Sequence, residues 1–325
     1  MHRLTAFLAA SLLATIATAG AQDVNITQHP AGLELLFAAE TMVIEQAEIS
    51  RPKAQGDITL RADVLFGGAP ALRVKLRRAE PGAETFNNVP RYDLAAYELQ
   101  KLFLDPEEYV VPPTALRMVP LADFARFAPE VERTFREAEQ QVLAVVQYWL
   151  NDITNAQDIY DPVRFAADSL YARHIGQLNL LTYLIEHRDS NLGNFLIGRA
   201  ATGPRVFSID HGVAFASEDS DRGELWKVIR VDRFPADAVE RLRAVTPELL
   251  KQRLGVLAQW RLEDGGYVPM PAGENMAFGR GVRSRDGVLQ MGLTELEITQ
   301  VYRQLARFLS QVDRGRLELV AGPGP

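Results

Sequence analysis

The spacing of apolar and polar residues divides the chain into a strand-rich first third and a helix-rich remainder. Residues 33–76 are strand-like, with short apolar runs and a turn at Gly67-Gly68. Ala95 and Leu99 lie on one helical stripe, which predicts a helix in the segment after these strands. The elements expected here are strands at 41–44, 57–64, 71–76 and 115–119, and a helix at 91–103.

Beyond residue 129 the apolar residues recur at helical intervals. Val131, Phe135, Ala138 and Val142 are spaced by 4, 3 and 4 residues, and the run continues to Trp149. This spacing predicts one long amphipathic helix that packs on the core. The other elements expected are helices at 168–186 and 235–262, an Asp-Gly hairpin turn at 286–287, and a last helix opened by a capping box at 294–297. The fold class predicted from these elements is α+β.

The composition excludes several kinds of site. The chain has no cysteine, which rules out disulfides, zinc–thiolate sites and cysteine nucleophiles. Its net charge is −7 and it has no polybasic run, so electrostatics give no reason to expect nucleic acid or an anionic membrane as partner. Five of the 35 basic residues are lysine, which draws attention to each lysine.

The first 21 residues have the pattern of a secretory signal peptide. Arg3 supplies the positive charge, residues 4–19 are mostly apolar, and small residues at 19–21 form the cleavage site. The apolar stretch is interrupted by hydroxyl residues and is shorter than the roughly 20 residues of a membrane-spanning helix. A retained membrane anchor is the alternative. Cleavage leaves 304 residues (325 − 21), with a periplasmic or extracellular location and no stable membrane insertion expected.

Two polar motifs carry the candidate chemistry. The run 187–189 (His-Arg-Asp) precedes Asn194 by five residues, and the run 210–212 (Asp-His-Gly) follows an apolar strand. Phosphoryl transfer needs one carboxylate to orient the acceptor hydroxyl, and an amide and a second carboxylate to hold metal ions on the phosphates. The spacing is that of a kinase catalytic loop and metal motif. We therefore predict Asp189 as the catalytic carboxylate, and Asn194 and Asp210 as ligands of Mg²⁺ or Mn²⁺.

Each of these residues taken alone has a simpler explanation. Asp189 by itself is an ordinary loop aspartate that caps a turn, and His187 and His211 are expected to pack the two loops and not to bind metal. The three residues in order, with an interval of 16 from Asn194 to Asp210, favour the catalytic arrangement. The motifs of serine hydrolases, zinc proteases and Walker-type nucleotide-binding proteins are absent.

Two segments resemble a known family. Residues 92–102 and the following 111–114 (Val-Pro-Pro-Thr) are similar to the small-lobe helix and next strand of atypical kinases. These are the phosphatidylinositol 3/4-kinase-like group and the secretory-pathway casein and xylose kinases, such as the Golgi casein kinase. The family's catalytic loop reads Asp-Arg-His-x-x-Asn and its metal motif Ile-Asp-x-Gly. This chain keeps the interval from Asp189 to Asn194, with Ser190 and Asn191 in place of Arg and His. The resemblance covers about residues 70–215.

The resemblance implies a two-lobed protein-kinase-like fold, with a small strand-rich N-lobe at 32–118 and a larger helical C-lobe at 119–320. It also implies that Lys75 is the strand lysine that binds the nucleotide phosphates. Asp93 falls where the family has a helix glutamate, and it is assigned to the same nucleotide-binding role. Glu98 is an alternative, but five residues along a helix place it about 140° from Asp93.

Two departures from the family bear on activity. Arg73 shares a strand face with Lys75 at a position where a nucleotide pocket has a small apolar residue, and Lys75 could also be an ordinary solvated lysine. The segment 48–56, which stands where a glycine-rich loop covers the phosphates, contains one glycine. We expect Lys75 and Asp93 to form a salt bridge that faces the cleft holding Asp210.

The leading hypothesis is an exported, ATP- and metal-dependent phosphotransferase that acts on a protein or glycan hydroxyl. One alternative is a pseudokinase, a kinase-shaped binding module of the cell envelope, which the poor glycine loop and the short acid Asp93 favour. Another is a kinase-like enzyme that transfers AMP instead of phosphate. The acceptor carries no sequence motif.

Overall fold

The computed structural model describes residues 24–39, 41–50, 58–86, 88–154, 159–199, 205–215 and 226–321. These residues form a mixed α+β molecule. The predicted signal peptide lies outside them, as does most of the glycine-poor segment 48–56. Within the described part of the chain, no helix is long and apolar enough to cross a membrane.

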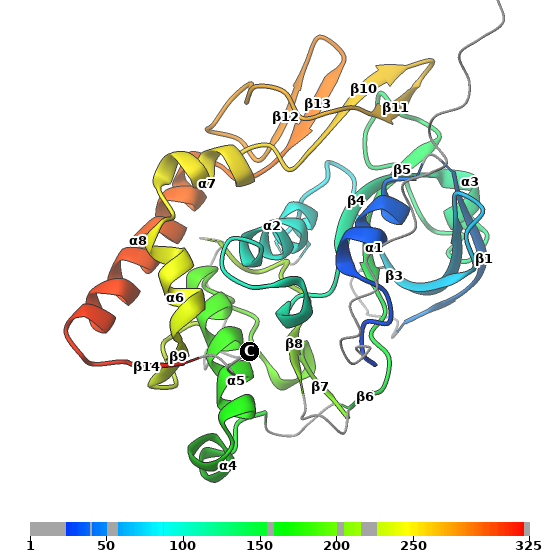
Figure 1. Ribbon diagram of the computed structural model, residues 1–325. Helices are drawn as coiled ribbons and strands as arrows, with labels where there is room; N and C mark the ends of the chain where they lie inside the picture. The colour runs from blue at the N-terminus through cyan, green and yellow to red at the C-terminus, as the bar shows by residue number, and fades with distance from the viewer. Residues whose placement is uncertain are drawn as a thin grey trace, which may run out of the picture.

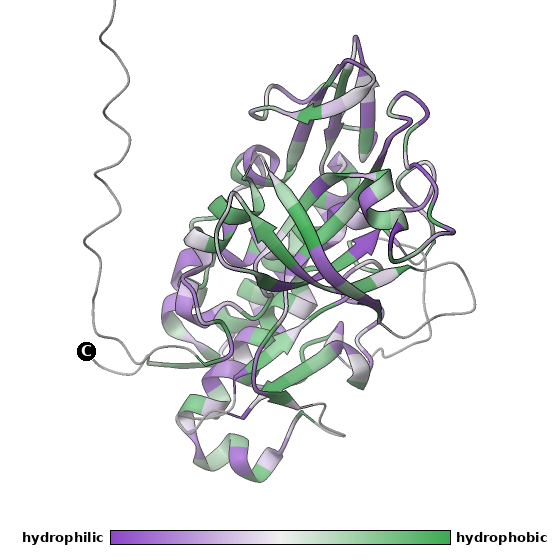
Figure 2. Ribbon diagram, turned by 90° about the vertical axis from the view of Figure 1, so that its right-hand side faces the viewer, coloured by the Kyte–Doolittle hydropathy of each residue, from purple (hydrophilic) through white to green (hydrophobic). Residues whose placement is uncertain are grey.

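The largest sheet has five antiparallel strands in the order β1-β2-β3-β5-β4 (Figure 1). One of its faces packs against two short helices, where Leu76 of the sheet shares a hydrophobic core with Phe37 and Phe124. Figure 2 shows hydrophobic positions in green along the strands in the middle of the view. The strands are β1 (Met42–Ile49), β2 (Thr59–Phe66), β3 (Leu72–Arg78), β4 (Thr114–Pro120) and β5 (Gln141–Tyr148).

Helices supply the largest share of a second, larger core on the other side of this sheet. Helix α2 connects β3 to β4 along the chain and contacts both β4 and β5. The helices are α1 (Pro30–Phe37), α2 (Pro90–Gln100), α3 (Leu121–Ala125), α4 (Pro162–Ala167), α5 (Ser169–Leu184), α6 (Ala236–Arg243), α7 (Pro247–Leu254) and α8 (Glu295–Asp313), with 3-10 turns η1 (Pro106–Glu108) and η2 (Leu192–Asn194).

Three smaller sheets complete the part of the fold that the structure describes. A four-stranded sheet is inserted between α7 and α8 and lies at the top of Figure 1. Gln141 at the start of β5 exchanges two hydrogen bonds with the backbone of Tyr267 in this sheet (3.3 and 2.6 Å), which joins it to the first sheet. The remaining strands are β6 (Ile153–Thr154), β7 (Phe195–Gly198), β8 (Val206–Ser208), β9 (Arg233–Pro235), β10 (Ala258–Glu263), β11 (Gly266–Pro269), β12 (Val282–Arg285), β13 (Val288–Met291) and β14 (Glu318–Val320).

The prediction of one long helix after residue 129 is wrong, because residues 141–148 form strand β5. Both faces of this strand are buried: Val142 and Val146 lie in the first core, while Leu143 and Val145 lie in the second. A strand buried on both faces is apolar at consecutive positions and lacks the alternation that identifies a strand. Since β5 pairs with β3 and β4, the sheet continues beyond the lobe boundary predicted after residue 118.

Two further predictions need correction. Residues 30–37 form helix α1, although the strand-like region was predicted to begin at Leu33. The helix predicted at 235–262 is two helices followed by a strand. Thr246 caps the second of these helices by accepting a hydrogen bond from the backbone N–H of Leu249 (3.1 Å), with Pro247 at its first position. This cap and proline are signals of a new helix start that the sequence contained.

Several predicted elements are confirmed. Helix α2, strand β4 and helix α5 lie where the sequence placed them. The Asp286-Gly287 turn joins β12 to β13, and both residues have positive φ (51° and 74°), as a tight hairpin turn requires. Helix α8 begins with the predicted capping box of Thr294 and Glu297.

The two faces of β3 give a test of its register. Leu76→Ala removes a fully buried side chain and should lower the free energy of unfolding by about 2–5 kcal/mol. Arg73→Ala removes a half-exposed side chain paired with Asp63, and should cost less than about 1 kcal/mol. Urea denaturation of both variants measures the difference, and equal losses would contradict the observed register.

Candidate active site

The β7–β8 hairpin brings the two predicted motifs together. Strand β7 follows Asn194 directly, and β8 ends two residues before Asp210. The backbone N–H of Ile209 donates to the carbonyl of Asn194 (3.0 Å), and the N–H of Arg188 donates to the carbonyl of Val213 (3.0 Å). The loop before the hairpin and the loop after it therefore lie side by side at one end of the two strands.

Asp189 is held in a defined orientation by two amides. The side-chain NH₂ of Asn191 donates to one carboxylate oxygen (2.8 Å), and that of Asn194 donates to the other (3.2 Å) and to the Asp189 carbonyl (2.7 Å). Neutral amide donors orient a carboxylate without neutralising its charge. Asp189 is also partly exposed. Its carboxylate can therefore reach a group that arrives from solvent.

Asp210 lies in a strained backbone conformation beside two cations. Its φ is 59°, in the left-handed region that residues other than glycine adopt at a cost and that is enriched at functional sites. The ammonium of Lys75 on β3 forms an ion pair with its Oδ1. A guanidinium nitrogen of Arg77 lies 3.9 Å from the same oxygen. Strand β3 and the hairpin thus meet at Asp210.

The expected salt bridge between Lys75 and Asp93 is not the one that forms. Arg77, two residues further along the same face of β3, pairs with Asp93 in the first turn of α2, while Lys75 pairs with Asp210. Lys75 faces the site as expected, with a side chain only 13% exposed, and Arg73 turns away to pair with Asp63. Asp93 of α2 therefore contacts the site through Arg77 and not through Lys75.

Asp93 remains charged although it is buried. Burial by itself raises the pKa of this carboxyl, but the guanidinium of Arg77 and the side chain of His211 outweigh it and hold the pKa below its usual value. The backbone N–H of His211 also donates to this carboxylate (3.0 Å). The position in the first turn of α2 also favours a negative charge. Asp93 therefore links three segments: β3, α2 and the loop that carries Asp210.

His187 and His211 pack against each other inside the molecule. Both side chains are fully buried, and their rings lie 5.0 Å apart. The Nε2 of His211 is 3.0 Å from the hydroxyl of Ser208, while burial lowers the pKa of His187 to about 3 and keeps its ring neutral. These positions agree with the packing role predicted for the two histidines next to Asp189 and Asp210.

Two side chains at this site carry oxygens that could serve as ligands of a divalent cation. The NH₂ of Asn194 is directed to Asp189, so its amide oxygen is the atom left to act as a ligand. Asp210 supplies a carboxylate, and oxygen ligands of this kind are preferred by Mg²⁺ and Mn²⁺. Lys75 already neutralises one oxygen of Asp210, so a cation must share this carboxylate with the lysine.

A separate acidic cluster is filled by an arginine. Asp105, Glu108 and Asp237 have carboxylate oxygens within 4.8 Å of one another. The guanidinium of Arg173 forms bidentate hydrogen bonds with Glu108 and Asp237, and Arg241 pairs with Asp105. The arginines supply the positive charge that a metal ion would bring, which leaves this cluster with a structural role.

Two residues of the site were not predicted from the sequence. Arg77 lies on the same face of β3 as Lys75, and this period-2 spacing was a usable signal. Asn191 replaces a histidine of the kinase pattern, but its amide orients Asp189 and caps the η2 turn through the N–H of Gly193 (2.8 Å).

A search against models of known protein families and against curated protein sequences finds no match for this chain.

The neutral, buried His187 predicts a pH effect on stability. Below pH 6.5 the unfolded chain binds a proton at this histidine, but the folded protein does not until the pH approaches 3. Stability from this group is therefore present above pH 6.5 and is lost as the pH falls, by about 2 kcal/mol between pH 7 and pH 5. Between pH 7 and pH 5 the His187→Phe variant should lose about 2 kcal/mol less free energy of unfolding than the wild type. Urea denaturation of both proteins at the two pH values measures this difference. Comparing each protein with itself cancels any constant cost of the substitution, and identical losses would contradict the assignment.

Proposed function

We propose that this protein is an exported, ATP- and metal-dependent kinase-like phosphotransferase that acts on a protein or glycan hydroxyl. The observation that carries the proposal is the meeting of two loops and one strand at a single place. Asp189 and Asn194 lie before the β7–β8 hairpin, Asp210 lies after it, and Lys75 reaches Asp210 from β3. The predicted signal peptide supports the exported location.

The arrangement of the elements supports a two-lobed kinase-like fold. The five-stranded sheet with its own core would form the smaller lobe, and the helices with the larger core would form the second lobe. Helix α2 lies between β3 and β4 in sequence and faces the site with Asp93. The cleft between the lobes would then hold the nucleotide, with Lys75, Arg77 and Asp210 around its phosphates.

Each residue of the site has a role in this proposal. Asp189, fixed by its two amide donors, orients the acceptor hydroxyl and accepts its proton as the phosphoryl group transfers. Lys75 binds phosphate oxygens, and Asp93 holds Arg77 close to the same place. Asn194 and Asp210 would hold the metal ion, which neutralises charge on the phosphates when it is bound.

One observation favours a pseudokinase as second candidate. Lys75 and Arg77 both lie near the Oδ1 of Asp210, so two cations already surround the predicted metal ligand. A site of this kind could hold phosphates through its own cations, without metal and without turnover. Nucleotide binding that does not respond to metal ions would support this candidate over the enzyme.

Asp210→Asn tests the metal ligand. Asparagine keeps the size of the side chain and tolerates the left-handed backbone at this position, so the fold should survive. Nucleotide with Mn²⁺ should raise the melting temperature of the wild type and leave that of the variant unchanged, because a charged ligand is lost. Asp63→Asn, a surface control on β2, should respond like the wild type. Equal shifts in all three proteins would remove Asp210 from the metal site.

Asp189→Asn tests the catalytic carboxylate. Asparagine cannot accept the proton of the acceptor hydroxyl, so turnover should fall about 100-fold or more, the usual contribution of a positioned base. Nucleotide affinity should stay within a few-fold of the wild type because this carboxylate faces the acceptor. Formation of ADP from ATP and nucleotide calorimetry measure the two quantities separately. Normal turnover in the variant would contradict the proposed mechanism.

A further inference from the structure

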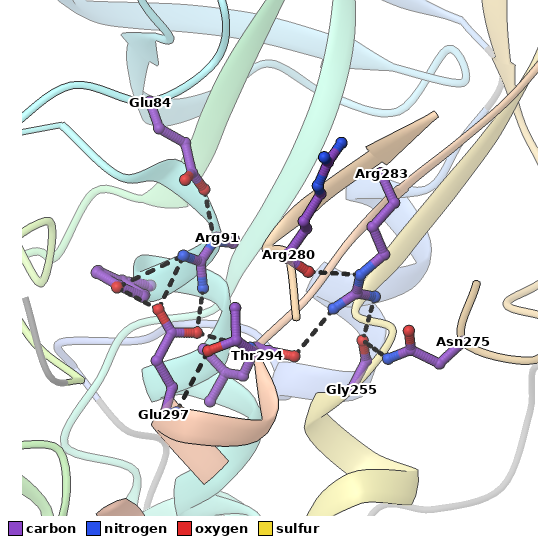
Figure 3. Close-up of polar contacts among 10 residues, drawn as sticks. Glu84, Arg91, Gly255, Asn275, Arg280, Arg283, Thr294 and Glu297 are labelled. Atoms are coloured by element: carbon purple, nitrogen blue, oxygen red, sulfur yellow. Dashed lines mark hydrogen bonds and ion pairs between the residues drawn. The ribbon is translucent and has the colours of Figure 1, made fainter. Parts of the chain in front are cut away.

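Helix α2 is tied to α8 by a buried ion-pair network that sequence analysis did not identify. Figure 3 shows the guanidinium of Arg91 between Glu84 and Glu297. The same guanidinium lies 3.5 Å from the hydroxyl of Tyr92. Two of its nitrogens donate to the two carboxylate oxygens of Glu297 (2.5 and 2.9 Å). Arg91 is 4% and Glu297 6% exposed. The network therefore lies in the interior, where an unpaired charge is strongly unfavourable.

The α8 end of this network is itself anchored. Glu297 accepts a hydrogen bond from the backbone N–H of Thr294 (2.7 Å), and the hydroxyl of Thr294 accepts one from the N–H of Glu297 (3.3 Å). Just before this cap, buried Arg283 of β12 donates to the carbonyl of Leu293 (2.9 Å). It also donates to the carbonyl of Gly255 (2.6 Å), as Figure 3 shows. The carboxylate that Arg91 meets is therefore held in place by α8 and by the inserted sheet.

The other end of the connection is the site. Arg91 and Asp93 are two residues apart in the first turn of α2, which places them about 200° apart around the helix. Arg91 points to α8, and Asp93 points to Arg77 and to the backbone N–H of His211. Within one helical turn there is no hinge, so a shift of the helix backbone at Arg91 moves Asp93 as well.

We propose that Arg91 and Glu297 are positioning residues, which hold α2 where Asp93 can meet Arg77 and the His211 backbone. The effect of the Asp93 contacts on nucleotide binding rests on the proposed function. The contacts themselves can be measured without any nucleotide. The inserted sheet and α8 would thus determine the geometry of a site to which they contribute no residue.

The direct test is hydrogen–deuterium exchange of the His211 amide, whose N–H donates to Asp93 (3.0 Å). The variant is Arg91→Met together with Glu297→Met, which removes both charges and refills the buried space. The His211 amide should exchange at least ten-fold faster than in the wild type. The Gly198 amide, which donates to the carbonyl of Arg205 (2.8 Å) in the β7–β8 hairpin, is the internal reference and should keep its rate.

Arg173→Met is the matched control. Arg173 is an equally buried arginine, paired with Glu108 and Asp237, and it lies near the opposite end of α5 from the catalytic loop. This variant should lose stability without a change at His211. A loss of stability in the double variant with unchanged His211 exchange would mean that the network is structural only, and would overturn the proposal.

A steric variant tests the same contact from the other side. A Cβ added at Gly281 would overlap the guanidinium of Arg91, so Gly281→Ala should displace this side chain without removing a charge. We expect faster His211 exchange here too, and a ten-fold loss of affinity for ATP with Mn²⁺ in both variants. If the His211 amide exchanges faster in the variants but the wild type does not bind ATP, the positioning role is supported and the proposed function is rejected. Unchanged His211 exchange in the double variant would reject the positioning role and leave the proposed function standing.

Discussion

The buried ion pair between Arg77 and Asp93 is the contact on which the geometry of the site depends. Their side chains are 4% and 2% exposed, so both charges have lost almost all contact with water. Such a pair is favourable only when its geometry is good and further hydrogen bonds complete it. The backbone N–H of His211 supplies one of these bonds. The relative positions of β3, α2 and the Asp210 loop are therefore fixed together.

This contact also sets the charge around Asp210. Because Asp93 takes one side of the Arg77 guanidinium, the other side is left near Asp210, where Lys75 already forms an ion pair. The predicted metal ligand is consequently flanked by two cations. A phosphate group would meet two cations here, Lys75 and Arg77, each of which also faces a carboxylate. Whether the site uses this charge for turnover or only for binding is what separates the two candidate functions.

The sequence predicts the parts of the site that are close together along the chain. The interval from Asp189 to Asn194 and the strand before Asp210 place three residues on one hairpin, and the structure brings them together. The partner of Asp93 could not be chosen from sequence alone, because Lys75 and Arg77 share a face of β3. Which of them reaches α2 depends on how the helix packs on the sheet, which is a tertiary property.

For the fold, as for the site, the sequence predicts the features that depend on neighbouring residues and not those that depend on tertiary packing. Turn and cap signals such as Asp286-Gly287 and Thr294 identified the hairpin and the start of α8 because these signals are local. Strand β5 was mistaken for a helix because its burial on both faces is decided by the two cores that meet there. The Arg91–Glu297 pair joins residues 206 positions apart, and no local pattern reveals it.

Titration of the purified wild-type protein with ATP, with and without Mn²⁺, tests the central claim most directly. Calorimetry measures the affinity in both conditions. A phosphoryl-transfer site built from Asp189, Asn194 and Asp210 predicts ATP binding that is clearly tighter with Mn²⁺ present. No binding of ATP under either condition would contradict the account of this site as a nucleotide site.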